Sequence, residues 1–288
     1  MAGFDDLELV RSRVDEPPPR RRPWIPLGIA AVLLILLAAA WFLGFRRVRP
    51  DTPPPQAATE QSVQPKTSTI RVPEPGEDID LPPLDESDAL VRELVARLSS
   101  HPRVAAWLAT DGLIRDFVAI VLNIAQGQTP TPHLAHVRPG GGFSVQKDGG
   151  RLRIDPETYR RYDAYATAIA GLDAQGAARL YATLKPRFEE AYQGLGAPDG
   201  TFDRTMEKAI VRLLDTPIVD GEIGLLSTSV SYSFADPALE GLAPSQRQFL
   251  RMGPANLRAV RAKLVEIAGF LGIAPESLPA ERVIRSRG

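Results

Sequence analysis

The feature that most constrains this chain is an uncharged apolar run, Trp24–Phe45. At about 1.5 Å of rise per residue, a helix over these residues covers the roughly 30 Å hydrocarbon core of a bilayer. Trp24 and Trp41 stand near its two ends, where amphipathic rings favour the headgroup level. A cleaved secretory signal is the alternative, but the apolar region of a signal is only about 7–15 residues long. We therefore expect an uncleaved transmembrane helix.

Arginines around this run indicate its orientation. Five lie shortly before it, and three lie within a similar distance after it. Because Lys and Arg near a membrane concentrate on its cytoplasmic side, the bias predicts an N-terminus in the cytoplasm. We expect a single-pass protein of the bacterial inner membrane with its C-terminal domain in the periplasm. The arginine-rich, lysine-poor composition is typical of a GC-rich bacterium.

Changes in composition divide the chain into four segments. Residues 1–23 contain too few apolar side chains to pack, so we expect a disordered cytoplasmic tail. Residues 24–45 are the transmembrane helix. Residues 46–85 form a proline-rich linker, which extends by up to about 3.1 Å per residue. Residues 86–288 are numerous enough to bury a core and are predicted to form one mainly helical periplasmic domain.

Charge and cysteine content exclude several kinds of function. The 34 basic and 35 acidic residues nearly balance, so no bulk positive charge favours a nucleic-acid partner. The absence of cysteine excludes disulfides, thiolate catalysis and cysteine metal sites. We expect no cofactor, no metal and no nucleic-acid partner.

Apolar residues recur at helical spacing through most of the C-terminal domain. Ser87 is the predicted N-cap of its first helix. The segment Leu113–Ile124 is apolar nearly all round and is predicted to be the buried centre. Pro186 is expected to kink its helix or to end its first half. Further helices are predicted to begin at Asp155, Asp173, Thr201, Pro244 and Pro254.

Two stretches of the domain alternate apolar and polar residues instead. Around residues 147–150, alternation on both sides of a Gly-Gly turn predicts a β-hairpin. Residues 218–234 alternate as well and predict a strand or a second short hairpin. The predicted fold class is therefore mainly α (α+β), a helical domain with one or two short β-hairpins.

Three motifs resemble metal-binding, nucleotide-binding or catalytic motifs, but the residues around them do not favour those functions. His133 and His136 have a metal-ligand spacing, but they lie between prolines and lack a third ligand. Residues 140–142 are three glycines that follow no strand, open no helix and lack the Lys-Ser/Thr of a nucleotide loop, so we expect a turn. Glu189 and Glu190 are adjacent, and on a helix they point about 100° apart, so they cannot flank one glycosidic bond.

Tyrosines and arginines offer the remaining candidates for a binding site. All six tyrosines lie in the domain, where packing in the core is expected more often than stacking on sugars. A basic group near the start of the last helix is the best site-like feature, because exposed N–H groups at a helix N-terminus attract anions. The alternative is a solvated basic surface. The candidate residues for an anion or a partner are Arg247, Arg251, Asn256, Arg258 and Arg261, with Lys263 nearby.

Three stretches of the domain resemble one known family. They are Leu250–Asn256, Leu195-Gly196 followed by residues 199–202, and residues 232–236 followed by Leu239-Glu240. Together they are similar to a bacterial family of single-span membrane proteins known as domain of unknown function 3014, over roughly Leu84 to Ile267. The resemblance implies an anchor, a variable proline-rich spacer and one mainly helical domain. It implies no activity, cofactor or catalytic residue.

Two functions remain as hypotheses. The first is a membrane-anchored, non-catalytic envelope protein whose periplasmic domain binds a protein or a cell-wall polymer. The anchor at Trp24–Phe45, the long linker and the lack of a recognisable catalytic motif favour it. The alternative is an envelope hydrolase that cleaves glycan with carboxylates not recognisable from their spacing.

Overall fold

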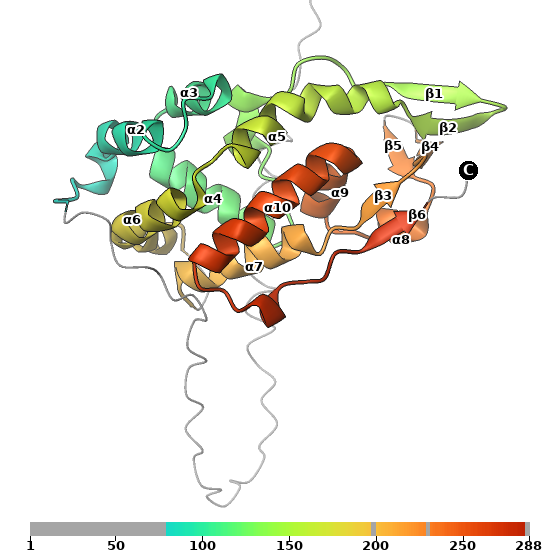
Figure 1. Cartoon of the computed structure of the whole chain (residues 1–288). Coiled ribbons are helices and arrows are strands. Elements are labelled where there is room, and N and C mark those ends of the chain that lie inside the picture. The colour runs from blue at the N-terminus through green and yellow to red at the C-terminus, as the bar shows by residue number, and fades with distance from the viewer. Residues whose placement is uncertain (1–78, 197–199, 229–230, 286–288) are drawn as a thin grey trace, which may run out of the picture. The chain divides into compact units, whose positions relative to one another are not determined.

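The computed structural model describes residues 79–196, 200–228 and 231–285 (Figure 1). The predicted tail, the predicted transmembrane helix and most of the predicted linker lie outside these ranges. Within them, no helix combines the length and the apolar character needed to cross a membrane.

Helices make up most of the described chain. The 3₁₀ helices are η1 (Leu84–Glu86), η2 (Pro132–Val137), η3 (Pro156–Tyr162) and η4 (Pro275–Ser277). The α-helices are α2 (Asp88–Ala96), α3 (Pro102–Leu108), α4 (Leu113–Ala125), α5 (Asp163–Ala170), α6 (Ala174–Gly194), α7 (Phe202–Leu214), α8 (Pro237–Glu240), α9 (Pro244–Leu250) and α10 (Pro254–Phe270). The mainly helical character that we predicted is confirmed.

The strands form two small sheets. The first is antiparallel and has the order β1-β2-β4-β5. Val145 pairs with Ile154 in the β1-β2 hairpin, and Leu225 pairs with Phe234 in the β4-β5 hairpin. Both alternating stretches therefore form hairpins, and pairing of β2 with β4 joins them. The second is the parallel pair β3-β6. The bounds are β1 (Val145–Asp148), β2 (Arg151–Ile154), β3 (Ile218–Asp220), β4 (Gly224–Ser227), β5 (Tyr232–Phe234) and β6 (Val283–Arg285).

Strand β6 lies outside the two stretches that we predicted to form strands. In its partner strand β3, the N–H of Ile218 donates to the carbonyl of Arg282, which directly precedes β6, over 2.8 Å. Arg282 also donates to the carboxylate of Asp215 over 3.1 Å. A strand of three residues has too little alternation to be recognised in sequence, so only the pairing reveals it.

The helical core is centred on α4, as predicted. Leu113 and Val118 are completely buried, and α4 packs against α6 and α7. Phe202 at the start of α7 is also completely buried, and its ring lies 5.5 Å from that of Phe188 and 5.8 Å from that of Tyr192, centroid to centroid. Such aromatic contacts add to the free energy of burying apolar area.

A second core lies between the strands and the C-terminal helices. It contains Ile154, Leu225 and Phe234 from the antiparallel sheet and Leu257 and Val260 from α10. Helix α10 also contacts α5, α6, α7, α9 and β3, so it joins the two cores (Figure 1).

Three local expectations need correction. Ser87 occupies the N-cap position of α2, as predicted, but its hydroxyl donates to the carbonyl of Leu84 over 2.7 Å and makes no capping bond to that helix. Helix α6 continues through Pro186 and does not end there. Arg187 donates to the carbonyls of Leu81 and Pro82 over 2.7 and 2.8 Å, so contacts of the domain begin ahead of the boundary that we placed after residue 85.

The packing of Phe202 predicts a large effect of its truncation. Phe202→Ala should lower the free energy of unfolding by about 3–5 kcal/mol, because it leaves a cavity among four aromatic rings. Phe270→Ala is the control, since Phe270 is 41% exposed at the end of α10 and should cost less than about 0.5 kcal/mol. Chemical denaturation of both variants measures the difference. Equal effects would contradict the assigned core.

Candidate functional site

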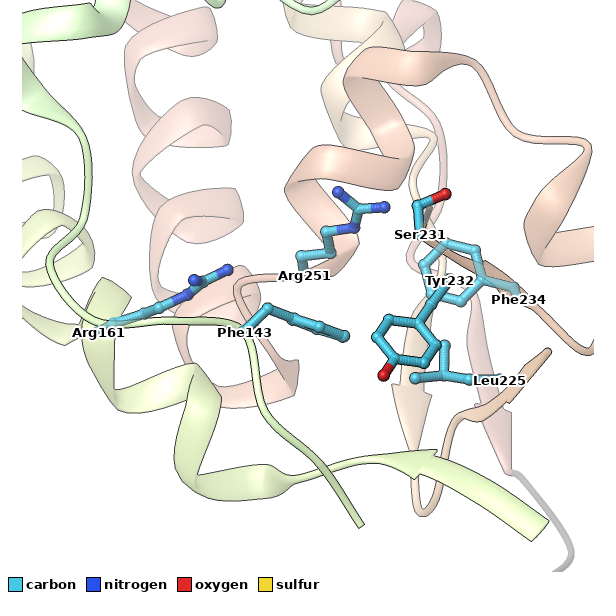
Figure 2. Close-up of a pocket in the computed structure, with 7 residues that line it drawn as sticks. All are labelled: Phe143, Arg161, Leu225, Ser231, Tyr232, Phe234 and Arg251. Carbon is cyan, nitrogen blue, oxygen red and sulfur yellow. The ribbon is translucent and has the colours of Figure 1, made fainter. Parts of the chain in front are cut away.

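An apolar cavity of about 260 Å³ lies where the antiparallel sheet meets the end of α9 and η3. Leu225 comes from β4, Tyr232 and Phe234 come from β5, and Arg161 comes from η3. Figure 2 shows the side chains converging from these separate segments. The cavity is lined by Phe143, Arg161, Leu225, Ser231, Tyr232, Phe234 and Arg251.

Aromatic and aliphatic side chains form the walls of this cavity. Leu225 and Phe234 are buried, whereas Tyr232 is 37% exposed. The rings of Phe143 and Tyr232 point toward each other with their centroids 6.0 Å apart (Figure 2). An apolar group that enters the cavity would therefore lose contact with water on several sides.

Two arginines add positive charge to these walls. The guanidinium of Arg161 lies 5.9 Å from the ring centroid of Phe143 and 4.9 Å from that of Tyr162. One of its terminal nitrogens donates to the hydroxyl of Tyr162 over 3.1 Å, but its Nε is buried and has no partner among the described residues. Arg251 forms no ion pair with any described acidic residue. Both charges thus face the cavity without a carboxylate to balance them.

A second cavity of about 360 Å³ adjoins the first and shares Ser231, Tyr232 and Arg251 with it. Its other lining residues are mostly polar. Arg247 is among them, but it pairs with Oε1 of Glu240, whose other oxygen accepts from the N–H of Phe234 over 2.8 Å. Arg251 is therefore the uncompensated cation between the two cavities. The remaining lining residues are Glu240 itself and Thr129, Thr228, Ser233, Pro244 and Gln248.

The stretch Leu250–Asn256 builds the corner that positions Arg251. Gly253 has a φ of 82°, and a Cβ there would lie 2.8 Å from the Cβ of Tyr159 and closer to its ring. Only glycine combines that backbone conformation with so close an approach. Burial behind this corner raises the pKa of Tyr159 to about 12. Because Tyr159 belongs to η3, the corner holds Arg251 near the helix that carries Arg161.

Asn256 completes the same corner. Its Nδ2 donates to the carbonyl of Tyr159 over 3.2 Å, to Oδ1 of Asp163 over 2.9 Å and to the carbonyl of Met252 over 3.1 Å. These bonds join α10 to η3 and to the start of α5. Asn256 therefore holds the site together, and its amide is not free to bind an anion.

The structure separates the five residues that we grouped as one basic site. Arg247 and Arg251 line the cavities, and Asn256 lies in the corner behind them. Arg258 pairs with Asp220 over 2.6 Å. Arg261 is 6% exposed and donates to the carbonyls of Leu214 and Pro279, and burial lowers its pKa. Nearby, Lys263 pairs with Glu266 over 2.6 Å.

The other sequence candidates take structural roles. His133 lies in η2, where we expected no helix, and its Nδ1 lies 2.9 Å from the carboxylate of Asp116. No group of three His, Asp or Glu side chains suited to a metal occurs within residues 79–285 as far as the structure describes them. Gly141 has a φ of 77°, consistent with the predicted turn. The side chain of His136 lies outside the described part.

Glu189 and Glu190 serve different purposes on α6. The carboxylate of Glu189 accepts from the N–H of Phe202 over 3.0 and 3.1 Å and so caps the start of α7. Glu190 pairs with Arg187 over 2.7 Å on the surface.

Sequence reasoning missed Phe143, Arg161 and Tyr232 as parts of a site. The alternating pattern identified Phe143 and Tyr232 only as strand residues, and nothing in the sequence distinguished Arg161 from the other arginines. A signal existed at Tyr232, which begins one of the family-like stretches. No local pattern marked Arg161, because its partners in the cavity come from distant segments of the chain.

The corner predicts opposite effects for two glycine substitutions at the two ends of α10. Gly253→Ala should lower the free energy of unfolding by about 1–3 kcal/mol, since its Cβ overlaps Tyr159 at a positive φ. Gly269→Ala meets no atom within 4 Å and should be neutral or stabilise the helix by up to about 1 kcal/mol. Thermal unfolding of both variants distinguishes them. A Gly253→Ala variant that is as stable as the unmodified chain would show that the contact with Tyr159 does not constrain the fold.

The comparisons agree with the family suggested by the three stretches. The family model described as "Protein of unknown function (DUF3014)" matches residues 113–268, a range that includes every residue lining the two cavities. No curated protein and no solved structure gives a significant match. Since the matched range exceeds half of the 288 residues, this chain belongs to the DUF3014 family of proteins of unknown function.

Proposed function

We propose that this protein is a membrane-anchored binding module of the bacterial envelope. The described domain binds an anionic group of a periplasmic protein or cell-wall polymer, and it does so without catalysis. The binding site is the pair of cavities around Arg251 and Tyr232, called here the arginine pocket.

One observation carries this proposal. Arg161 and Arg251 line one partly apolar cavity, and neither pairs with a described carboxylate. Elsewhere in the domain, arginines such as Arg247 and Arg258 pair with acidic residues. Two like charges that share a cavity repel each other, and an anionic ligand would relieve that repulsion.

The anchor and the location rest on the sequence. Trp24–Phe45 has the length and the flanking tryptophans of a transmembrane helix, and the arginine bias favours a periplasmic domain. The proline-rich residues 46–85 would let the arginine pocket reach a partner at a distance from the membrane.

The alternative of a glycan hydrolase gains no support from the acidic residues that first suggested it. Glu189 caps a helix, Glu190 forms a surface ion pair, and the buried carboxylate of Asp203 accepts from Tyr181 over 2.7 Å and pairs with Lys185 over 2.6 Å. Each of these groups already has a partner within the fold.

The proposed topology predicts the outcome of reporter fusions. Alkaline phosphatase fused to the C-terminus of the full chain should be active, because this enzyme folds only after export. A fluorescent protein that matures only in the cytoplasm should stay dark at the same position and fluoresce at the N-terminus. The reverse pattern would place the domain in the cytoplasm.

The proposed site predicts which substitutions abolish partner capture. After crosslinking in cells, the tagged full chain should recover one or more partners, and a chain with Arg161→Ala and Arg251→Ala should lose most of that recovery. Arg160→Ala is the matched control, since Arg160 is adjacent in sequence, 74% exposed and paired with Glu157. Capture that is unchanged in the double variant would refute the site.

A further inference from the structure

We infer that the arginine pocket binds an acidic peptide segment in which a carboxylate lies beside an aromatic or large aliphatic side chain. This inference rests on the proposed function and specifies its ligand.

The two arginine guanidiniums indicate which kind of anion the pocket binds. A guanidinium presents a planar fork of N–H donors that matches the two oxygens of a carboxylate. Arg161 and Arg251 line the same cavity, and neither has a carboxylate partner among the described residues. A ligand carboxylate at the mouth of the cavity would accept from Arg251 and balance the charge of Arg161.

The apolar walls indicate which kind of group lies next to the anion in the ligand. Leu225 and Phe234 offer no hydrogen-bonding side-chain atom, and a volume of about 260 Å³ is below the roughly 300–1,000 Å³ typical of a complete small-molecule site. The space suits one apolar side chain. A sugar would bring several hydroxyl groups, and those against Phe143, Leu225 and Phe234 would have no partner, at a cost for each unpaired group.

The aromatic rings close one side of the cavity. The rings of Phe143 and Tyr232 are tilted by 46° with centroids 6.0 Å apart, so they contact each other. No ligand ring fits between them, and the preference for a peptide side chain over a glycan rests on the apolar walls.

The second cavity extends the site for the rest of a peptide. It shares Arg251 with the first cavity and offers the hydroxyl groups of Thr129 and Ser233 and the amide oxygen of Gln248, whose Nε2 donates to the hydroxyl of Tyr162 over 3.1 Å. Glu240 also lines this cavity, where Arg247 balances its charge. Such groups can hydrogen-bond the N–H and C=O groups of a bound backbone. A segment that crosses Arg251 would place its apolar side chain in one cavity and its backbone along the other.

Fluorescence anisotropy of labelled peptides with the full chain in nanodiscs tests this inference. The probe is a short peptide that alternates glutamate with phenylalanine. One matched peptide has glutamine in place of glutamate, and another has serine in place of phenylalanine. We expect each replacement to weaken binding at least about tenfold, because it removes either the charge-assisted hydrogen bonds or the buried ring.

Protein variants separate the pocket from the rest of the surface. Arg251→Ala should weaken binding of the acidic aromatic peptide at least about tenfold, and Arg251→Lys should lie between, since lysine keeps the charge but loses the fork. Arg160→Ala should change it less than about twofold. Thermal unfolding confirms that each variant is folded. The side chain of Arg251 forms no hydrogen bond or ion pair with any described residue, so its truncation is expected to leave the fold intact.

Three outcomes would overturn the inference. The first is equal binding of the glutamate and glutamine peptides, and the second is binding that ignores Arg251. The third is Arg251-dependent binding of inorganic phosphate or phosphatidylglycerol vesicles that is tighter than binding of any peptide. If the peptides do not bind but crosslinked capture still requires Arg161 and Arg251, the inferred ligand class is wrong and the proposed function stands. If capture also ignores both arginines, the proposed function fails as well.

Discussion

The close contact between Gly253 and the ring of Tyr159 is the constraint on which the candidate site depends. It requires a residue without a Cβ at a positive φ, directly before the proline that begins α10. The amide of Asn256 strengthens this corner by serving three acceptors with two N–H groups, so at least one N–H is shared. The stretch that looked like an anion site is therefore the support behind the site.

The corner has an electrostatic consequence. It brings together the end of α9 and η3, and each contributes an arginine to one cavity. The fold neutralises or satisfies other arginines nearby, with Glu240 for Arg247, Asp220 for Arg258 and backbone carbonyls for Arg261. Arginines without an ion pair elsewhere, such as Arg151 and Arg179, are exposed, whereas Arg161 and Arg251 are half-buried beside apolar walls. There the local dielectric is lower than in water, and an ionic contact with a ligand is correspondingly stronger.

Local sequence patterns predicted much of the fold. Continuous apolar character identified α4 as the centre, and alternation around Gly-Gly identified the β1-β2 hairpin. The patterns did not predict β6, because three residues carry no measurable alternation and their pairing with β3 spans the whole C-terminal region. Of the two outcomes predicted for Pro186, the end of the helix is excluded, since packing of α6 on both sides of it outweighs the loss of one helical hydrogen bond. Of the predicted basic site, Arg247 and Arg251 line the arginine pocket, while Arg258 and Arg261 have partners that no spacing rule reveals.

By itself, the amino-acid sequence determined the mainly helical class, the position of the first hairpin and the family to which the chain belongs. These follow from hydrophobic periodicity, turn residues and short motifs, all of which act between neighbours in the chain. Only the tertiary structure decided which arginines keep an unbalanced charge and which rings surround them. Arg161, Phe143, Tyr232 and Arg251 lie far apart in sequence, and their meeting depends on a corner built from Gly253, Tyr159 and Asn256. Burial and charge pairing are properties of contacts in space, so they become readable only when the chain is folded.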